Sequence, residues 1–386
     1  METIKQLDER YVAHTYRRSA SIVSGKGSLC YGPDGKRYID MGSGIGVTAF
    51  GFCDEEWNRA VTEQLQKVQH TSNLYYTEPC ARLAALLCEK TGFSRVFFGN
   101  SGAEANECAI KVARKYAYDK KGVTDPVIVT LTNSFHGRTH TTLAATGQDH
   151  FHTLFQPLTP GFAHIAAGDL DAFASLVEKG NVAGVLIECV QGEGGVFVLE
   201  KDFVSGLYEI CQKNDILFMV DEVQTGNGRT GTLYAYEQYG VKPDVVTTAK
   251  GLGGGLPIGA ALLSDKVKDT LGYGDHGSTF GGNPIASAGA VSIVERLTPA
   301  FLDAVKKKGD YIKARLSGKS GIRSVSGLGL MIGVETEKAA SEVLSLCMEK
   351  GVLCLTAKTK VRLLPALNIP DEILDEALNV IIDACR

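Results

Sequence analysis

The sequence lacks any long apolar run and any excess of charge of one sign. No stretch of its 386 residues approaches the roughly 20 consecutive apolar residues of a membrane-spanning helix. Lysine and arginine number 40 against 44 aspartates and glutamates, which gives a formal net charge of −4. Nucleic acids and anionic membranes are bound by strongly basic surfaces. We therefore expect neither nucleic acid nor a membrane as a partner.

Cysteine is present, but never in a C-x-x-C spacing. The ten cysteines are scattered along the chain, and several, such as Cys189 and Cys354, stand in apolar runs. This distribution is typical of buried, reduced thiols in a reducing compartment. Residues 1–10 contain three acidic side chains and no apolar core, unlike a signal peptide or a transit peptide. The sequence thus predicts a cytoplasmic location.

Two ionisable residues stand out because each follows a short apolar run. Residues 216–220 lead into Asp221, and residues 244–249 lead into Lys250, which a glycine-rich turn follows. Burial at the end of a strand disfavours the charged form of a lysine and leaves a nucleophilic amine. Pyridoxal phosphate enzymes need such a pair: an amine that binds the cofactor, and a carboxylate for its pyridine nitrogen.

Short apolar runs alternate with helical stretches between about residue 95 and residue 265. The runs are apolar throughout rather than alternating, which is typical of strands covered on both faces. The pattern predicts an α/β protein with a mostly parallel sheet and a helix at residues 103–118. The expected strands lie at residues 95–98, 127–131, 184–188, 216–220, 245–248 and 260–263.

The pattern beyond about residue 290 is that of a smaller α+β unit. We expect one helix near residues 286–316, β structure within 322–335, a helix at 338–350, strands at 352–355 and 361–364, and a last helix from Asp371. The predicted division is an N-terminal segment (1–40) that packs with the small domain, a large cofactor-binding domain (41–285) and a small C-terminal domain (286–386).

Several loops carry residues suited to ligand contacts. Ser101 is a good N-cap, and Glu104 three residues later completes a capping-box pattern, so this helix start suits either a phosphate or an ordinary cap. Phe135 can stack on a flat ring, and Arg138 can clamp a carboxylate or form a surface ion pair. Residues 277–282 form a glycine-rich hydroxyl loop that suits oxygen anions or a plain turn.

Metal and nucleotide sites are disfavoured. His136 and His140 are four residues apart, but Gly137 between them weakens a helix and the sequence offers no evident third ligand. Residues 44–49 fit a G-x-G-x-x-A pattern, yet no amphipathic helix follows them. We expect no metal.

In their order along the chain, these motifs resemble those of the class III aminotransferases, a group of fold type I pyridoxal phosphate enzymes. The resemblance rests above all on residues 218–231 and 244–251 and covers about residues 10–380. Within the class it is strongest to the acetylornithine aminotransferases. The resemblance implies pyridoxal phosphate as cofactor, a seven-stranded, mostly parallel sheet in the large domain, and a homodimer with its active site at the subunit interface.

The resemblance implies which residues would hold the cofactor. Lys250 would bind it covalently, Asp221 would keep its pyridine nitrogen protonated, and Gln224 would reach its ring hydroxyl. Phe135 would stack on the ring. The phosphate would lie at the start of the first helix of the large domain, with a hydroxyl from the partner subunit; the residues are Ser101, Gly102, Ala103 and the partner's Thr279.

It also implies how two substrates would be bound. Arg138 and Ser278 would hold the α-carboxylate end of an acylated substrate. Arg362 would bind the α-carboxylate of glutamate or 2-oxoglutarate, and Glu193 would pair with Arg362 when no such carboxylate is present. Ile45 stands where ornithine aminotransferases have a tyrosine near the free α-amine, and an aliphatic residue suits an acylated amine.

The expected reaction is transamination between N-acetylornithine and 2-oxoglutarate, a step of arginine biosynthesis. Succinylornithine, ornithine and GABA remain alternative substrates. An aminomutase of the same fold is a further alternative, which needs no 2-oxoglutarate. A catalytically silent cofactor-binding protein is the non-enzyme alternative, and the presence of both Lys250 and Asp221 argues against it.

Overall fold

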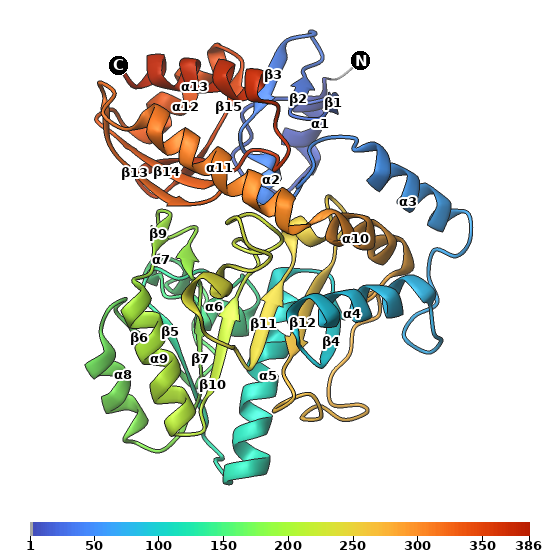
Figure 1. Ribbon diagram of the computed structural model, residues 1–386, viewed down its shortest axis with the longest axis vertical. Helices are drawn as coiled ribbons and strands as arrows, with labels where there is room; N and C mark the ends of the chain where they lie inside the picture. The colour runs from blue at the N-terminus through green and yellow to red at the C-terminus, as the bar shows by residue number, and fades with distance from the viewer. Residues whose placement is uncertain (1–2) are drawn as a thin grey trace.

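The computed structural model describes residues 3–386, and a seven-stranded sheet forms the middle of its lower half in Figure 1. The strand order is β4-β12-β11-β10-β7-β5-β6. β12 is antiparallel to both of its neighbours, and the other adjacent pairs are parallel. The predicted α/β fold with a mostly parallel seven-stranded sheet is confirmed. The strands are β4 (Arg95–Gly99), β5 (Val127–Leu131), β6 (Phe162–Ile165), β7 (Val182–Ile187), β10 (Leu217–Asp221), β11 (Val245–Thr248) and β12 (Gly259–Leu263).

Both faces of this sheet are covered, which explains why its strands are apolar throughout. Every residue of β7, β10 and β12 is buried. Along β10, Phe218 and Val220 join one core cluster with the side chains of α9 (Lys201–Lys213), whereas Leu217 and Met219 join a second cluster with α5 (Gly102–Lys121). Burial of each such side chain contributes about 1.5–3 kcal/mol. The sheet is therefore a rigid platform for the loops at its edge.

Other short elements complete this part of the chain. They are α3 (Glu55–Leu65), α4 (Glu78–Thr91), α6 (His140–Ala145), α7 (Asp149–His152), α8 (Leu170–Val177), the hairpin β8 (Val190–Gln191) and β9 (Phe197–Val198), and the 3₁₀ turns η1 (Ala235–Tyr239) and η2 (Lys250–Leu252). Strand β6 is not among the predicted strands, because its four residues, FAHI, form a run that is too short to stand out.

The C-terminal part forms a second, four-stranded sheet in the order β13-β14-β17-β16, with helices beside it (Figure 1). One continuous helix near residues 286–316 was a wrong prediction. Two helices are present, bent by 78° relative to each other, because Thr298 caps a new helix whose first residue is Pro299. The elements are α10 (Pro284–Arg296), α11 (Pro299–Leu316), β13 (Ile322–Leu328), β14 (Met331–Thr336), α12 (Ala340–Glu349), β16 (Leu355–Ala357), β17 (Lys360–Leu363) and α13 (Asp371–Cys385).

The N-terminal strands join the C-terminal part of the chain. β1 (Ser24–Lys26), β2 (Leu29–Tyr31) and β3 (Arg37–Asp40) form an antiparallel meander, and β3 pairs in parallel with β15 (Val352–Leu353). Two helices flank this meander in sequence, α1 (Ile4–Tyr11) and α2 (Ser43–Gly46). The exact division of the chain into residues 1–40, 41–285 and 286–386 stays a prediction.

All ten cysteines are free thiols, and six of them are buried. Within residues 3–386 no single helix is long and apolar enough to cross a membrane; only the bent pair α10 and α11, taken together, has the necessary length and composition.

Candidate active site

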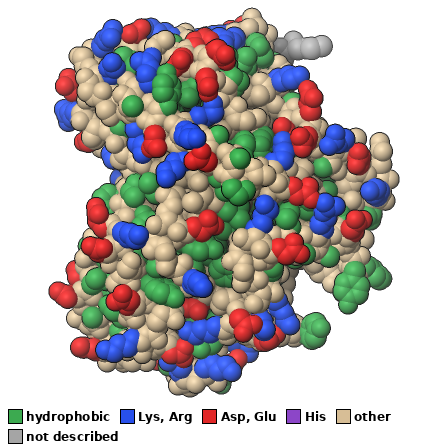
Figure 2. Space-filling model, in the orientation of Figure 1, with side chains coloured by type: hydrophobic (Ala, Val, Ile, Leu, Met, Phe, Trp, Pro, Cys, Tyr) green, Lys and Arg blue, Asp and Glu red, His purple; other side chains and the backbone are tan. Residues whose placement is uncertain are grey.

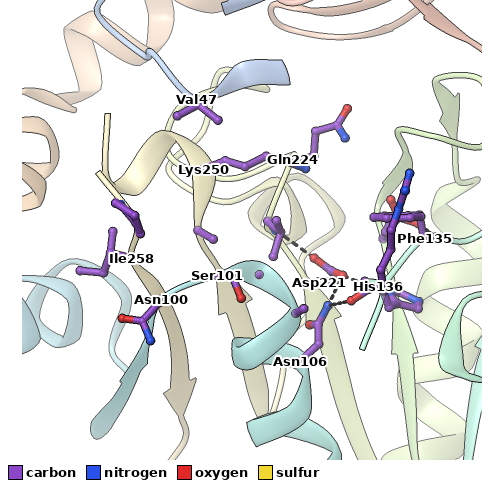
Figure 3. A pocket seen from close by; sticks show the side chains of 18 of the residues that line it. Val47, Asn100, Ser101, Asn106, Phe135, His136, Asp221, Gln224, Lys250 and Ile258 are labelled. Atoms are coloured by element: carbon purple, nitrogen blue, oxygen red, sulfur yellow. Dashed lines mark hydrogen bonds and ion pairs between the residues drawn. The ribbon is translucent and has the colours of Figure 1, made fainter. Parts of the chain in front are cut away.

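A cavity of about 420 Å³ opens at the carboxyl ends of the parallel strands. Its lining combines residues that follow β4, β5, β7, β10 and β11, together with Tyr16, Val47 and residues 255–258. Ligands of open α/β sheets bind at this edge, where loops from several strands meet. Lys250 and Asp221 both line the cavity, as do Ser101, Gly102 and Ala103 (Figure 3). The two strand-end residues therefore share one crevice.

Lys250 lies in a strained turn immediately after β11. Its φ is +45°, a left-handed conformation that is uncommon for a residue with a side chain and is found most often at functional sites. Burial lowers the pKa of the Lys250 ammonium; Arg362 adds to this effect, while Glu193 and Asp221 oppose it. The lowered pKa increases the fraction of neutral, nucleophilic amine near neutral pH.

Asp221 is a buried carboxylate held by three donors. Oδ2 accepts from the Nδ2 of Asn106 at 2.7 Å and lies 2.8 Å from the Nδ1 of His136, while Oδ1 accepts from the N–H of Val223 at 3.0 Å (Figure 3). The hydroxyl of Thr247 donates to Asn106 Oδ1 at 2.6 Å and thereby fixes the orientation of that amide. This network holds the carboxylate in one rotamer at the cavity wall.

The start of α5 has main-chain N–H groups of the kind that can bind an anion. Ser101 accepts from the N–H of Glu104 at 3.2 Å, and the Glu104 carboxylate in turn accepts from the N–H of Asn100 at 2.7 Å. The N–H groups of Gly102 and Ala103 belong to the first turn, where a helix offers them no carbonyl partner. A Cβ on Gly102 would lie 2.6 Å from a methyl group of Val223, so only glycine permits this close approach. The predicted phosphate loop therefore has the required donors.

Phe135 and Arg138 follow β5 and form another wall of the cavity. Arg138 is exposed, and its guanidinium carbon lies 5.3 Å from the ring centre of Phe151 and 5.9 Å from that of Tyr16. Aromatic rings at this range attract the cation and limit its rotamers. His136, between the two wall residues, is buried against Asp221, whereas His140 is exposed, so these histidines do not converge on a common ligand.

Glu193, Gln224 and Arg362 form a connected group beside the cavity. Arg362 Nη1 donates to the carboxylate of Glu193 at 2.6 Å and to Gln224 Oε1 at 3.0 Å. Burial alone would raise the pKa of Glu193, but the charge and hydrogen bond of Arg362 outweigh it, so the pKa is lowered. Arg362 is only 3% exposed and its Nε has no partner within the described structure. Arg362 can therefore donate a further hydrogen bond to an anion.

Besides Glu193 and Arg362, three more predicted site residues do not line the cavity in this chain. Ser278 accepts a hydrogen bond from Asn100, a lining residue, at 3.0 Å, and Thr279 is exposed. Ile45 is 37% exposed and has a φ of +66°, within a left-handed turn that starts at Ser43. A β-branched residue in this conformation is a genuine outlier.

The sequence predicts no role for the other lining residues: Tyr16, Val47, Asn100, Asn106, His136, Gly137, Glu188, Val223, Ala249 and residues 255–258. The sequence does contain a signal for Glu188: it follows the apolar residues 184–187, as Asp221 follows the apolar residues 216–220. Asn106 and His136 stand inside the recognised motifs, where only the fold shows that they meet at Asp221. Tyr16 lies in an irregular segment, without any periodic pattern that could place it.

Glu222, the neighbour of Asp221, points away from the cavity into the core. It is fully buried, and its carboxylate accepts from the Thr225 hydroxyl at 2.5 Å and from the N–H of Tyr236 at 2.8 Å. Burial raises its pKa to about 7, a rise that the hydrogen bonds oppose. The folded state therefore binds this proton more tightly than the unfolded chain, whose glutamate titrates near pH 4.3.

We expect Glu222→Gln to flatten part of the pH dependence of stability. Because the folded pKa is raised, the contribution of Glu222 is complete below about pH 4 and is lost as the pH rises towards 7. The free energy of unfolding falls by about 3 kcal/mol over this range, and the Glu222→Gln variant does not show this fall because glutamine does not titrate. Urea unfolding at pH 5 and pH 8 measures the difference. An exposed control, Glu209→Gln, should leave the slope unchanged, and an equal slope in both variants would contradict the assignment.

Comparison with known proteins agrees with this geometry. The sequence profile of the family "Aminotransferase class-III" matches residues 11–385. An acetylornithine aminotransferase from Haemophilus ducreyi is 52% identical over 383 residues, 98% of each chain, and a succinylornithine transaminase from Citrobacter koseri is 45% identical over 94% of this chain and 92% of its own. The crystal structure of an ornithine aminotransferase from Toxoplasma gondii superposes with a TM-score of 0.95 at 31% identity, covering 100% of this chain and 95% of that one. The chain belongs to the class III aminotransferases.

Proposed function

We propose that this enzyme transfers an amino group from N-acetylornithine to 2-oxoglutarate, giving N-acetylglutamate 5-semialdehyde and glutamate. The observation that carries the proposal is the Arg362–Glu193 pair beside Lys250, in a chain that is 52% identical to an acetylornithine aminotransferase. An arginine that is hidden or exposed by one glutamate allows a single site to accept two substrates of different charge. Arginine biosynthesis is the process that such a reaction serves.

The cavity fits pyridoxal phosphate, the cofactor of the family. A buried carboxylate, Asp221, suits a protonated pyridine nitrogen, and the first turn of α5 suits a phosphate. We propose that Lys250 binds the cofactor covalently, that Gln224 reaches the ring hydroxyl and that Phe135 stacks on the ring. The phosphate would be held by Ser101, Gly102 and Ala103, together with the partner's Thr279.

The residues of the site then have distinct tasks. When bound, pyridoxal phosphate withdraws the electrons left on the substrate carbon as its C–H bond breaks. Asp221 holds a positive charge at the ring nitrogen, and its rigid network keeps that carboxylate in place. Burial lowers the pKa of Lys250. Its Nζ accepts the proton from the substrate carbon and then donates that proton to the carbon that is protonated later in the same half-reaction.

Substrate selection is assigned to two groups of residues, Arg138 with Ser278 and Arg362 with Glu193. Arg138, restrained by Tyr16 and Phe151, and Ser278 would bind the carboxylate at the acylated end of N-acetylornithine. Arg362 would bind the α-carboxylate of glutamate once Glu193 moves away. When the amine-bearing end of N-acetylornithine occupies this place, Glu193 returns and hides the positive charge. The aliphatic side chain of Ile45 has no group that could accept a hydrogen bond from a free α-amine, which suits a substrate whose α-amine is acylated.

A pair of arginine variants should separate the two half-reactions. Arg362→Gln is expected to raise the KM for 2-oxoglutarate by about 10²-fold, because a charge-assisted, bidentate contact is lost. Its KM for N-acetylornithine should change much less. Arg138→Gln is expected to show the opposite pattern. Steady-state kinetics with each substrate varied in turn provide the measurement, and equal effects of both variants on both substrates would contradict the assignment.

A comparison of N-acetylornithine, succinylornithine, ornithine and GABA tests the substrate proposal directly. We expect the highest kcat/KM with N-acetylornithine. A preference for ornithine or GABA would overturn the proposal, and product formed without any 2-oxoglutarate would indicate an aminomutase.

We further propose that the enzyme is a cytoplasmic homodimer whose active site lies at the subunit interface. Figure 2 shows hydrophobic side chains that project from the molecule at the lower right. Large exposed hydrophobic residues occur on two loops: Leu74, Tyr75 and Tyr76 between α3 and α4, and Tyr273 and Phe280 after β12. Apolar groups gathered in this way are typical of subunit interfaces. The second loop also carries Thr279. Light scattering should give twice the chain mass of 41.3 kDa, and a fully active monomer would contradict the proposal.

A further inference from the structure

Glu188 is a buried carboxyl group just after β7, and no step of the proposed reaction uses it. Its side chain lines the cavity, although the residue is only 5% exposed. Oε2 accepts a hydrogen bond from the N–H of Phe135 at 2.9 Å, and Oε1 accepts one from the N–H of Gly192 at 3.3 Å. The two oxygens of one carboxylate thus hold two different loops by their main chains.

Each of these loops carries a residue that the proposed function needs. Phe135 forms the aromatic wall of the cavity (Figure 3), and Gly192 directly precedes Glu193, which is paired with Arg362. A hydrogen bond to a main-chain N–H fixes the backbone from which the side chain starts. Glu188 therefore connects the loop of the aromatic wall to the loop that carries Glu193.

Only an ionised carboxylate satisfies both N–H groups fully. An amide offers one oxygen acceptor, and its NH₂ group would face the second N–H, donor against donor. Burial raises the pKa of Glu188 to about 7; His136 and the two N–H groups oppose this rise, and Asp221 adds to it. Burying a carboxyl group whose pKa is raised in this way is unfavourable for folding. Groups with strongly perturbed pKa values cluster at functional sites.

We propose that Glu188 is a positioning residue for both half-reactions: by binding the main chains of Phe135 and Gly192, it fixes the ring-stacking aromatic wall relative to the Glu193–Arg362 pair. The inference rests on the proposed function, because it assigns Glu188 to the same cofactor and to the same substrate switch.

The variant Glu188→Gln tests the proposal, with pyridoxal phosphate and 2-oxoglutarate as probes. Titration of the apoenzyme should show the Kd for pyridoxal phosphate raised by about tenfold or more, because one buried N–H loses its acceptor. The circular dichroism of the visible cofactor band should weaken, since the aromatic wall is no longer fixed. The KM for 2-oxoglutarate should rise in the same variant, because the Glu193 loop is released at the same time.

Glu222→Gln is the matched control, since Glu222 is equally buried, binds a main-chain N–H and lies outside the cavity lining. It should leave all three measurements unchanged. The proposal is overturned if Glu188→Gln matches the wild type within twofold in all three, or if only its thermal stability falls. Failure of the proposed function is distinguishable, because it would be seen in the wild type itself, as a preference for ornithine or GABA, as product formed without 2-oxoglutarate or as no transamination at all.

Glu188→Asp is the second variant, for use if Glu188→Gln does not fold. Aspartate keeps both acceptor oxygens on an arm shorter by one methylene, so it can reach one loop but not both. We expect either the cofactor Kd or the KM for 2-oxoglutarate to rise by about threefold or more, with the circular dichroism band altered if the Phe135 loop is the one released. Values of all three within twofold of the wild type would overturn the proposal.

Discussion

The variant Lys250→Ala is expected to lose the visible absorbance band of bound pyridoxal phosphate and at least about 10⁴-fold of the transamination rate. Among the described residues that line the cavity, Lys250 is the only lysine. Its removal takes away both the amine that binds the cofactor and the base that moves the substrate proton. The pocket itself should survive, because Asp221 and the start of α5 are held by contacts that do not involve this lysine.

Lys266→Ala is a suitable control for this loss. Lys266 is exposed and forms an ion pair with Asp215 at 2.9 Å, and it does not line the cavity. The control should keep both the absorbance band and the activity. Spectra of the purified variants, recorded with pyridoxal phosphate in excess, give the measurement. A band that persisted in Lys250→Ala at wild-type intensity would show that another lysine binds the cofactor.

The central sheet could be predicted from the sequence because its strands are buried on both faces. Residues 127–131 and 245–248, for example, are continuous apolar or β-branched runs, and they are β5 and β11. The single helix expected near residues 286–316 was wrong because its hydrophobic pattern continues through the break at Thr298 and Pro299. Proline at the first position of a helix is compatible with both a start and a kink, so local sequence does not separate them.

The candidate site could be predicted where each residue ends a strand or starts a helix. Lys250, Asp221 and Ser101 are of this kind, and one end of a parallel sheet brings them together. The partners of Asp221 could not be assigned, since Asn106 and His136 are 115 and 85 residues away from it in sequence. Their meeting depends on how α5 and the loop after β5 pack on the sheet.

Asp221→Asn should slow the reaction by about 10²- to 10³-fold while preserving the fold. A carboxylate beside a cation changes a pKa by one to three units, about 1.4 kcal/mol each, and asparagine loses this interaction without a change in size. The amide oxygen can still accept from Asn106 and His136, and only the N–H of Val223 loses its acceptor, so most of the surrounding network should remain in place. Cofactor affinity should fall less than the rate, because the phosphate contacts at α5 are unaltered.

Asp244→Asn provides the matched control. Asp244 is also a buried aspartate at a strand terminus: it is 6% exposed and accepts a hydrogen bond from the N–H of Phe218 at 2.9 Å. Unlike Asp221, it does not line the cavity. It lies at the start of β11, and Lys250 follows the other end of the same strand. If the charge at the ring nitrogen is what matters, single-turnover rates should fall in Asp221→Asn alone. An equal fall in both variants would mean that loss of a buried aspartate slows the enzyme through general destabilisation, and the assigned role of Asp221 would be wrong.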